Sequence, residues 1–180
     1  MEISLSKARI EELFHALDQE LRRRGVVGEL YVVGGAVLWV ALNARPATRD
    51  VDAYFEPAKI VREAAARVSK SLDVPENWLN DAVKGFMSPD GDYRPFLELE
   101  NLRVLMARPE YLLAMKCLAF RLSAEFHDEA DVRYLLRYLN IERYDAALAV
   151  ITRYYPRERF PQKAFYALEE ILGAGQSGTA

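Results

Sequence analysis

The first stretch of the chain places apolar residues at helical spacing. From about Ser6 to Arg24 they recur every three to five positions, and charged residues occupy the other faces. This pattern predicts an amphipathic helix that ends at Gly25, because glycine is favoured just past a helix C-terminus. The apolar positions are Leu5, Ile10, Leu13, Phe14, Leu17 and Leu21.

A glycine pair separates a short apolar run from the next helical segment. Leu30 to Val33 is a β-prone run, Gly34-Gly35 stops it, and helix-forming residues continue from Ala36 to Leu42. This order predicts a buried strand, a glycine turn and a short helix in immediate succession.

A second strand is predicted from Asp50 to Phe55, followed by a helix from Pro57 to about Leu72. Because side chains alternate across a strand, Asp50, Asp52 and Tyr54 are expected to share one face. The pattern therefore points two carboxylates in the same direction.

The rest of the chain comprises a mixed region, a hairpin and a helical half. Residues 75–89 mix aromatic and polar positions, and we predict a helix and a loop there. Two strands, at 96–100 and 103–107, are expected to form a β-hairpin. From Pro109 onward the spacing is helical, with helices predicted at 109–123, 128–139, 141–154 and 161–172.

Together these elements predict an α+β fold, with a small mixed sheet flanked by helices and a C-terminal helical bundle. We expect an α/β lobe over residues 1–107 and a helical lobe over residues 108–173 that shares its core. The small, polar residues 174–180 are expected to form a flexible tail.

Composition narrows the class of protein. Of the 180 residues, 51% are hydrophobic, which excludes a disordered chain. The single cysteine, Cys117, cannot form an internal disulfide, and we expect a cytoplasmic protein. We expect no signal peptide and no membrane insertion, because the longest apolar stretch, Leu30 to Leu42, is too short to cross a bilayer. The net charge of −3 gives no general attraction to nucleic acid.

The aspartate pair is the first candidate for chemistry. Carboxylates two residues apart on a strand, as at Asp50 and Asp52, can bind one or two Mg²⁺ ions. The pattern also arises by chance, with Asp50 as a turn residue and Asp52 as a local cap. Gly34-Gly35 favours the metal interpretation, because backbone amides at a strand-to-helix junction can receive phosphate oxygens. A purely structural glycine turn is the alternative.

The two motifs together resemble the signature of the DNA polymerase beta nucleotidyltransferase superfamily. The matching residues are Val33-Gly34-Gly35 and, on the next strand, Asp50-Val51-Asp52-Ala53. The resemblance implies a minimal nucleotidyltransferase fold in which Gly34 and Gly35 contact a nucleoside triphosphate and Asp50 and Asp52 bind Mg²⁺ or Mn²⁺. The stretch between the motifs, Ala36 to Arg49, is slightly longer than is usual in the superfamily.

The helical half carries a second resemblance. Residues 111–116 and 127–132 are similar to the Leu-x-x-x-Lys and Arg-Asp-x-x-Asp segments of abortive-infection nucleotidyltransferase toxins and their prokaryotic relatives. The resemblance implies that Lys116 and one of Asp128 and Asp131 complete the active site. His127 departs from the pattern, since an arginine usually stands there.

The residue types around Lys116 also indicate an anionic partner, because an ammonium on a mostly apolar helix is costly to bury alone. A structural ion pair with Asp128 or Asp131 and a contact with a triphosphate are both open. A third carboxylate often completes metal sites of this kind. Glu98 and Glu100 share one face of the predicted hairpin, and Glu98 is the favoured candidate, although exposed strand glutamates are more often solvated.

Other polar residues are expected to be structural. His15 and His127 have no zinc-type spacing. The basic residues Arg153, Arg157, Arg159 and Lys163 are compatible with a phosphate-backbone contact, but a solvated helix surface is favoured.

The leading hypothesis is a cytoplasmic nucleotidyltransferase that moves a nucleoside monophosphate from a triphosphate to an acceptor hydroxyl. The resemblance to toxins suggests tRNA as one acceptor and a cognate protein of a toxin-antitoxin pair as one partner. The alternative is a catalytically degenerate, antitoxin-like binding or regulatory protein that keeps the fold.

Overall fold

A computed structural model describes residues 4–43, 47–120 and 128–173. His127, the predicted helix end at Ser123 and the predicted tail at 174–180 lie outside these residues. The fold is mixed α+β, and within the described residues it contains a five-stranded sheet. By its internal contacts the chain divides into two compact units: residues 1–85 with 93–107, and residues 86–92 with 108–180.

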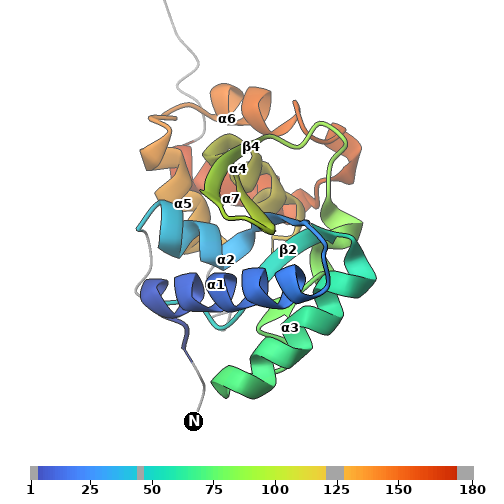
Figure 1. The fold of residues 1–180 in the computed structure, drawn as a ribbon. Coiled ribbons are helices and arrows are strands. Elements are labelled where there is room, and N and C mark those ends of the chain that lie inside the picture. Colours follow the sequence, from blue (N-terminus) through green and yellow to red (C-terminus); the bar gives the residue numbers. More distant parts are fainter. Residues whose placement is uncertain (1–3, 44–46, 121–127, 174–180) are drawn as a thin grey trace, which may run out of the picture. The chain divides into compact units, whose positions relative to one another are not determined.

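The first unit holds the sheet (Figure 1). Its helices and strands, in chain order, are α1 (Lys7–Arg23), β1 (Gly28–Val33), α2 (Gly34–Ala36), the π-helix η1 (Val37–Ala41), β2 (Val51–Glu56), α3 (Ala58–Leu72), β3 (Leu79–Asn80), the 3₁₀-helix η2 (Ala82–Phe86, whose last residue belongs to the second unit), β4 (Tyr93–Glu98) and β5 (Leu102–Ala107).

The sheet is mixed, with the strand order β3-β2-β1-β5-β4. The pairs β1/β2 and β4/β5 are antiparallel, whereas β1/β5 and β2/β3 are parallel. In register, Val33 of β1 pairs with Asp52 of β2, and Asp52 pairs with Asn80 of β3. The other end of the β1/β2 pair joins Glu29 to Glu56.

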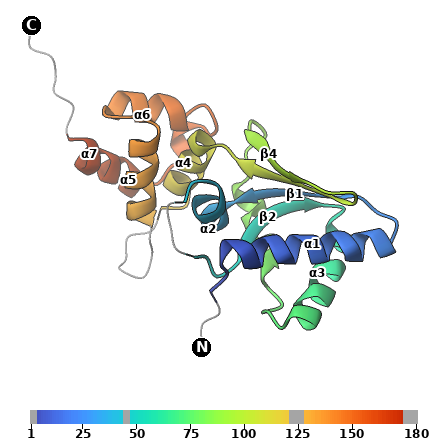
Figure 2. The same ribbon diagram turned by 60° about the vertical axis from the view of Figure 1, so that its left-hand side comes forward.

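Helices α1 and α3 cover one face of the sheet, where they lie side by side (Figures 1 and 2). Alternate strand residues such as Leu30, Val32 and Ala53 are completely buried on this face. At Gly28 a Cβ atom would stand 2.8 Å from the Leu21 side chain and 3.3 Å from that of Val61, so both helices press against the strand. Asp52, Tyr54 and Glu56 alternate with the buried residues and therefore occupy the opposite face.

Helix α1 forms as the apolar spacing predicts. Its N-cap is Ser6, whose hydroxyl accepts a hydrogen bond from the Arg9 amide at 3.2 Å. Gly25 follows the helix with a φ of 65°, a conformation that glycine adopts without strain. Ile10, Leu13, Phe14, Leu17 and Leu21 are fully buried, so the predicted apolar stripe is the face that enters the core.

The segment after α3 differs from its prediction. In place of a helix and a loop it forms the two-residue strand β3 and then η2. Trp78 anchors the strand, since its indole donates a hydrogen bond to the Ala65 carbonyl of α3 at 3.1 Å and its side chain is fully buried. A strand of two residues is too short to produce a detectable alternation of polar and apolar positions.

The second unit holds α4 (Pro109–Leu118), α5 (Asp128–Tyr138), α6 (Tyr144–Ile151), the 3₁₀-helix η3 (Arg157–Arg159) and α7 (Gln162–Leu172). Residues 86–92, placed in the first lobe by the sequence, belong to this unit. They are attached through Ser88, whose amide donates to the Tyr111 hydroxyl at 2.8 Å and whose hydroxyl donates to the Tyr154 carbonyl at 2.5 Å. No helix in the described part of the chain is long and apolar enough to cross a membrane.

Candidate functional site

The glycine turn of the first unit lies directly against Asp52. Gly34 has a φ of 68°, which only glycine adopts readily. A Cβ atom at this position would stand 2.9 Å from Oδ2 of Asp52, closer than ordinary contact allows. Position 34 therefore favours glycine for two reasons: the positive φ of its backbone and the Asp52 carboxylate beside it. The first N–H groups of a helix have no carbonyl partner within that helix. The backbone N–H groups that follow the turn are therefore suited to binding an anion.

The helix that follows this turn is irregular. Residues Gly34–Ala36 form one short α-helical turn, which continues as the π-helix Val37–Ala41. The predicted helix from Ala36 to Leu42 thus starts two residues earlier and has a wider hydrogen-bond pattern. Trp39 lies in this helix, and its Nε1 atom is buried. Among the described residues, it is the one buried side-chain nitrogen or oxygen without a hydrogen-bond partner.

Asp50 immediately precedes β2 and is held at two points. Its carbonyl accepts a hydrogen bond from the Thr48 hydroxyl at 3.1 Å, and its Oδ2 lies 3.3 Å from Nδ2 of Asn80. Thr48 is itself fixed by backbone hydrogen bonds to Leu5. Asp50 and the register pair Asp52 and Asn80 therefore gather at one end of the β2 and β3 strands.

The two aspartates interact electrostatically. Partial burial raises the pKa of Asp50 above its usual value, the negative charge of Asp52 raises it further, and Arg49 lowers it. Because the two carboxylates repel each other, a cation bound between or beside them would be favourable.

The donor set fits Mg²⁺ when the ion enters together with a substrate. Among the described residues, no group of three or more histidine, cysteine, aspartate or glutamate side chains could enclose a metal ion. Mg²⁺ usually takes one or two protein carboxylates and completes its shell with water and substrate phosphates. Asp50 and Asp52 supply the one or two carboxylates that this coordination uses. They are too few to enclose a structural ion in an all-protein cage.

Glu98 does not join the aspartates. It pairs in register with Arg103, which pairs with Glu29 at the end of the sheet opposite Asp52. Asp52 and Glu56 lie four positions apart on β2, a distance of about 13 Å at strand spacing. The Glu98 side chain is 75% exposed and lies 3.7 Å from Arg103. The predicted hairpin is present, but its register places Glu98 away from Asp50 and Asp52.

Lys116 contacts both Asp128 and Asp131, the two aspartates that the sequence offered as its partners. In the second unit its Nζ is 2.8 Å from Oδ2 of Asp131 and 3.4 Å from Oδ1 of Asp128. The lysine side chain is 16% exposed, and each aspartate side chain is 4% exposed. Both aspartates stand in the first turn of α5, where negative charge also stabilises the helix dipole. Of the two alternatives left open for Lys116, the ion pair is thus present, with two partners instead of one.

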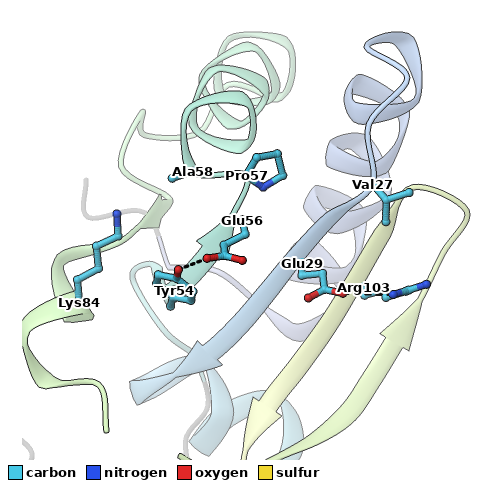
Figure 3. A pocket seen from close by; sticks show the side chains of 8 residues that line it. All are labelled: Val27, Glu29, Tyr54, Glu56, Pro57, Ala58, Lys84 and Arg103. Carbon is cyan, nitrogen blue, oxygen red and sulfur yellow. Dashed lines mark hydrogen bonds and ion pairs between the residues drawn. The ribbon is translucent and has the colours of Figure 1, made fainter. Parts of the chain in front are cut away.

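A shallow hollow lies at the end of the sheet away from Asp52, beside Glu29 and Glu56 (Figure 3). Glu29 and Glu56 face each other across the β1/β2 pair, which would be repulsive without compensation. Glu29 accepts hydrogen bonds from the Tyr31 hydroxyl at 2.9 Å and from Arg103 at 3.2 Å, and Glu56 accepts one from the Tyr54 hydroxyl. Because these groups satisfy one another, we assign no ligand to the hollow.

The basic residues near the C-terminal helices contact aromatic rings of their own unit. The guanidinium carbons of Arg153, Arg157 and Arg159 lie 5.5, 4.7 and 5.2 Å from the ring centroids of Tyr154, Phe165 and Tyr155, respectively. These distances are those of cation–π contacts. The contacts give the arginines a structural role that the sequence did not indicate.

Asn80 is the polar residue of the site that the sequence did not identify. The signal for it was weak, because Asn80-Asp81 follows Trp78-Leu79 in a region without periodic spacing. Comparison with protein-family models, with curated proteins and with solved structures finds no match to this chain.

Proposed function

We propose that this protein is a metal-dependent nucleotidyltransferase acting in the cytoplasm. The reaction converts a nucleoside triphosphate and an acceptor hydroxyl into an acceptor carrying the nucleoside monophosphate, pyrophosphate and one proton. The observation that carries the proposal is the position of the Asp52 carboxylate against Gly34, with Asp50 beside it at the same end of the sheet. A glycine turn can receive phosphate oxygens, and a carboxylate pair can hold the metal ion that accompanies a triphosphate.

Within this proposal each residue has a defined task. Asp50 and Asp52 hold Mg²⁺ or Mn²⁺, and the turn at Gly34 and Gly35 gives phosphate oxygens close access to backbone amides. The bound metal supplies neutralisation of the charge that develops on the phosphoryl oxygens during transfer. Asp50 is fixed in place by Thr48 and Asn80, so its carboxylate needs little reorganisation before it binds.

The helical residues enter the proposal through the resemblance to abortive-infection toxins. Lys116 would contribute positive charge toward the triphosphate, and Asp128 and Asp131 would orient it. Its salt bridges to both carboxylates support the orienting role. We also propose that the fold is a minimal nucleotidyltransferase core with a C-terminal helical bundle. By the same resemblance, tRNA is a candidate acceptor and a cognate toxin-antitoxin protein is a candidate partner.

A second candidate is a degenerate nucleotidyltransferase fold that binds nucleotide or protein without turnover, as an antitoxin-like regulator would. The position of Glu98 favours it, because this candidate for the third carboxylate lies beside Arg103, at the end of the sheet opposite Asp52. The two candidates differ in turnover but share metal-dependent binding of the triphosphate.

A transfer assay separates the candidates. The protein is incubated with each α-labelled nucleoside triphosphate, Mg²⁺ or Mn²⁺, and total cellular RNA or protein, and label is followed into macromolecules. We expect metal-dependent labelling that the Asp50→Asn, Asp52→Asn double variant lacks. Metal-dependent nucleotide binding without any labelling would favour the regulator. Equal labelling by the wild type and the double variant would refute the proposed site.

A further inference from the structure

Asn80 occupies the edge of the sheet next to both aspartates. It is the second residue of β3, and its Cα is paired in parallel register with that of Asp52. Paired residues direct their side chains to the same face, so Asn80 and Asp52 share the face away from α1 and α3. From this position the Asn80 amide nitrogen lies 3.3 Å from Oδ2 of Asp50.

Two hydrogen bonds determine the orientation of the Asn80 amide. The amide N–H of Ala82 donates to Oδ1 of Asn80 at 3.2 Å, and a backbone N–H can only donate. The atom facing Ala82 must therefore be the oxygen, which leaves the NH₂ group facing Asp50. A carboxylate that faces the NH₂ group accepts a hydrogen bond. Both contacts thus require the same amide orientation.

The backbone beneath Asn80 is firmly anchored. The Val51 amide donates to the Trp78 carbonyl at 2.7 Å, and the Trp78 indole is bonded to α3. On the other side, Asp81 pairs with Arg62 of α3 at 2.6 Å and with Lys84 at 2.9 Å. These contacts fix a two-residue strand at an edge where few other interactions would hold it.

We infer that Asn80 is a positioning residue for the metal site: its side-chain amide orients the Asp50 carboxylate. The inference rests on the proposed function, because Asp50 is assigned to the metal there. In this arrangement Asn80 acts through Asp50 and does not itself contact the metal, since its oxygen is turned toward Ala82.

An amide suits this position better than a further carboxylate. Asp50 and Asp52 already repel each other, and a third negative charge on β3 would add to that repulsion. An N–H donor instead stabilises negative charge on Asp50 and restricts its rotation while leaving the second oxygen available. Groups that orient metal-binding carboxylates in this way typically change metal affinity by about 10–100-fold when removed.

The contact between Asn80 and Asp50 is tested first without metal. In a ¹H–¹⁵N spectrum of the full chain, the side-chain amide resonances of Asn80 are assigned and compared between the wild type and Asp50→Ala. We expect the Asn80 signals to move upfield in the variant, because a hydrogen bond to a charged acceptor is lost. The Asn101 side-chain amide, which donates to the Val26 carbonyl at the other end of β1, serves as the internal control. Unchanged Asn80 signals would overturn the inference.

The role toward the metal is tested by titration of Mn²⁺, alone and with ATP, followed by electron paramagnetic resonance of the free ion. We expect Asn80→Ala to weaken Mn²⁺ binding about tenfold or more. The matched variant Asn101→Ala loses a comparable side-chain hydrogen bond and should bind Mn²⁺ within about twofold of the wild type. Urea unfolding of both variants shows whether each is folded.

The outcomes separate this inference from the proposed function. If wild-type protein binds no Mn²⁺ with or without ATP, the proposed metal site fails, and the metal role of Asn80 fails with it, although the amide spectrum still reports whether the contact exists. If the wild type binds Mn²⁺ and folded Asn80→Ala binds it equally well, the proposed function stands and Asn80 is only a cap for Ala82.

Discussion

The Asp52 carboxylate lies where a side chain on Gly34 would have to stand, with Oδ2 2.9 Å from the position of a Cβ atom. This relationship joins two motifs that lie fifteen positions apart at their nearest residues, Gly34-Gly35 and Asp50-x-Asp52. The antiparallel pairing of Val33 with Asp52 produces it. The glycine is thus explained by the fold as well as by the proposed ligand, and substitutions can separate the two explanations.

Replacing Gly34 with alanine should destabilise the protein. A non-glycine residue with positive φ costs about 1–3 kcal/mol, and the new methyl group would also displace Asp52. Gly25→Ala is the matched control, because Gly25 has a φ of 65° but nothing within 4 Å of an added Cβ. We expect Gly34→Ala to lose more stability in urea unfolding than Gly25→Ala, and to weaken Mn²⁺ binding, which Gly25→Ala should leave intact. Identical behaviour of the two variants would contradict the close contact.

Asp50→Asn should stabilise the protein at neutral pH. The folded-state pKa of Asp50 is raised by burial and by Asp52, so the folded protein carries an unfavourable charge above that pKa. Removing the charge should increase the free energy of unfolding by less than about 1 kcal/mol, because solvent screens the charge of this partly buried side chain. The gain should shrink as the pH falls through the folded-state pKa and disappear below about 3.9, where the carboxyl is neutral in both states.

Asp81→Asn provides the control of opposite sign. Hydrogen bonding to Lys84, and secondarily to Arg62, lowers the pKa of Asp81. This carboxylate therefore stabilises the fold above its unfolded pKa, and the stabilisation is lost as the pH falls through the folded pKa. We expect Asp81→Asn to lower the unfolding temperature at neutral pH and to have no effect in acid. Shifts of the same sign for Asp50→Asn and Asp81→Asn would refute this electrostatic account.

Lys116→Met should destabilise the second unit strongly. The substitution keeps much of the side-chain volume but leaves Asp128 and Asp131 buried without their shared cation, a change that costs about 3–5 kcal/mol. Lys163→Met, on α7 of the same unit, should change stability by less than about 1 kcal/mol. Denaturant unfolding measures both. A Lys116→Met protein of wild-type stability would show that the salt bridges are not structural, and reduced nucleotide affinity in that variant would assign the lysine to the triphosphate.

Cys117 should be unreactive in the folded protein. Its side chain is 1% exposed, and burial raises the pKa of the thiol to about 12. Since the thiolate is the reactive form, alkylation at neutral pH should be slow until the chain unfolds. Labelling with a thiol reagent in increasing urea should follow the unfolding transition. Rapid labelling in native buffer would place Cys117 at the surface.

Much of the fold could be predicted because its helices and long strands have strong periodic patterns. Helix α1 was expected from Ser6 to Arg24 and spans Lys7–Arg23, and α3 ends at Leu72 as expected. The hairpin is also present, although β4 begins and ends a few residues earlier than predicted. Local sequence determines α1 and α3, since each of these helices buries one regular apolar face.

The parts that could not be predicted depend on contacts between distant residues. Strand β3 exists because Trp78 packs under α3 and Leu79 pairs with Val51, neither of which leaves a periodic signal. The placement of Glu98 depends on the register of β4 and β5, which includes an irregularity between Pro95 and Leu97. The aspartate pair was identified from its spacing together with Gly34-Gly35, but its contact with Gly34 and its link to Asn80 required the sheet order.

The most direct test of the central claim is the affinity for triphosphate with and without Mg²⁺, measured on the wild type and on the Asp50→Asn, Asp52→Asn double variant. Removing both charges relieves their repulsion, so the variant should fold with equal or greater stability. The account predicts that wild-type protein binds ATP, or another nucleoside triphosphate in the same titration, only when Mg²⁺ is present, and that the folded double variant does not bind it. Unchanged metal-dependent affinity in a folded double variant would contradict the assignment of Asp50 and Asp52 as metal ligands.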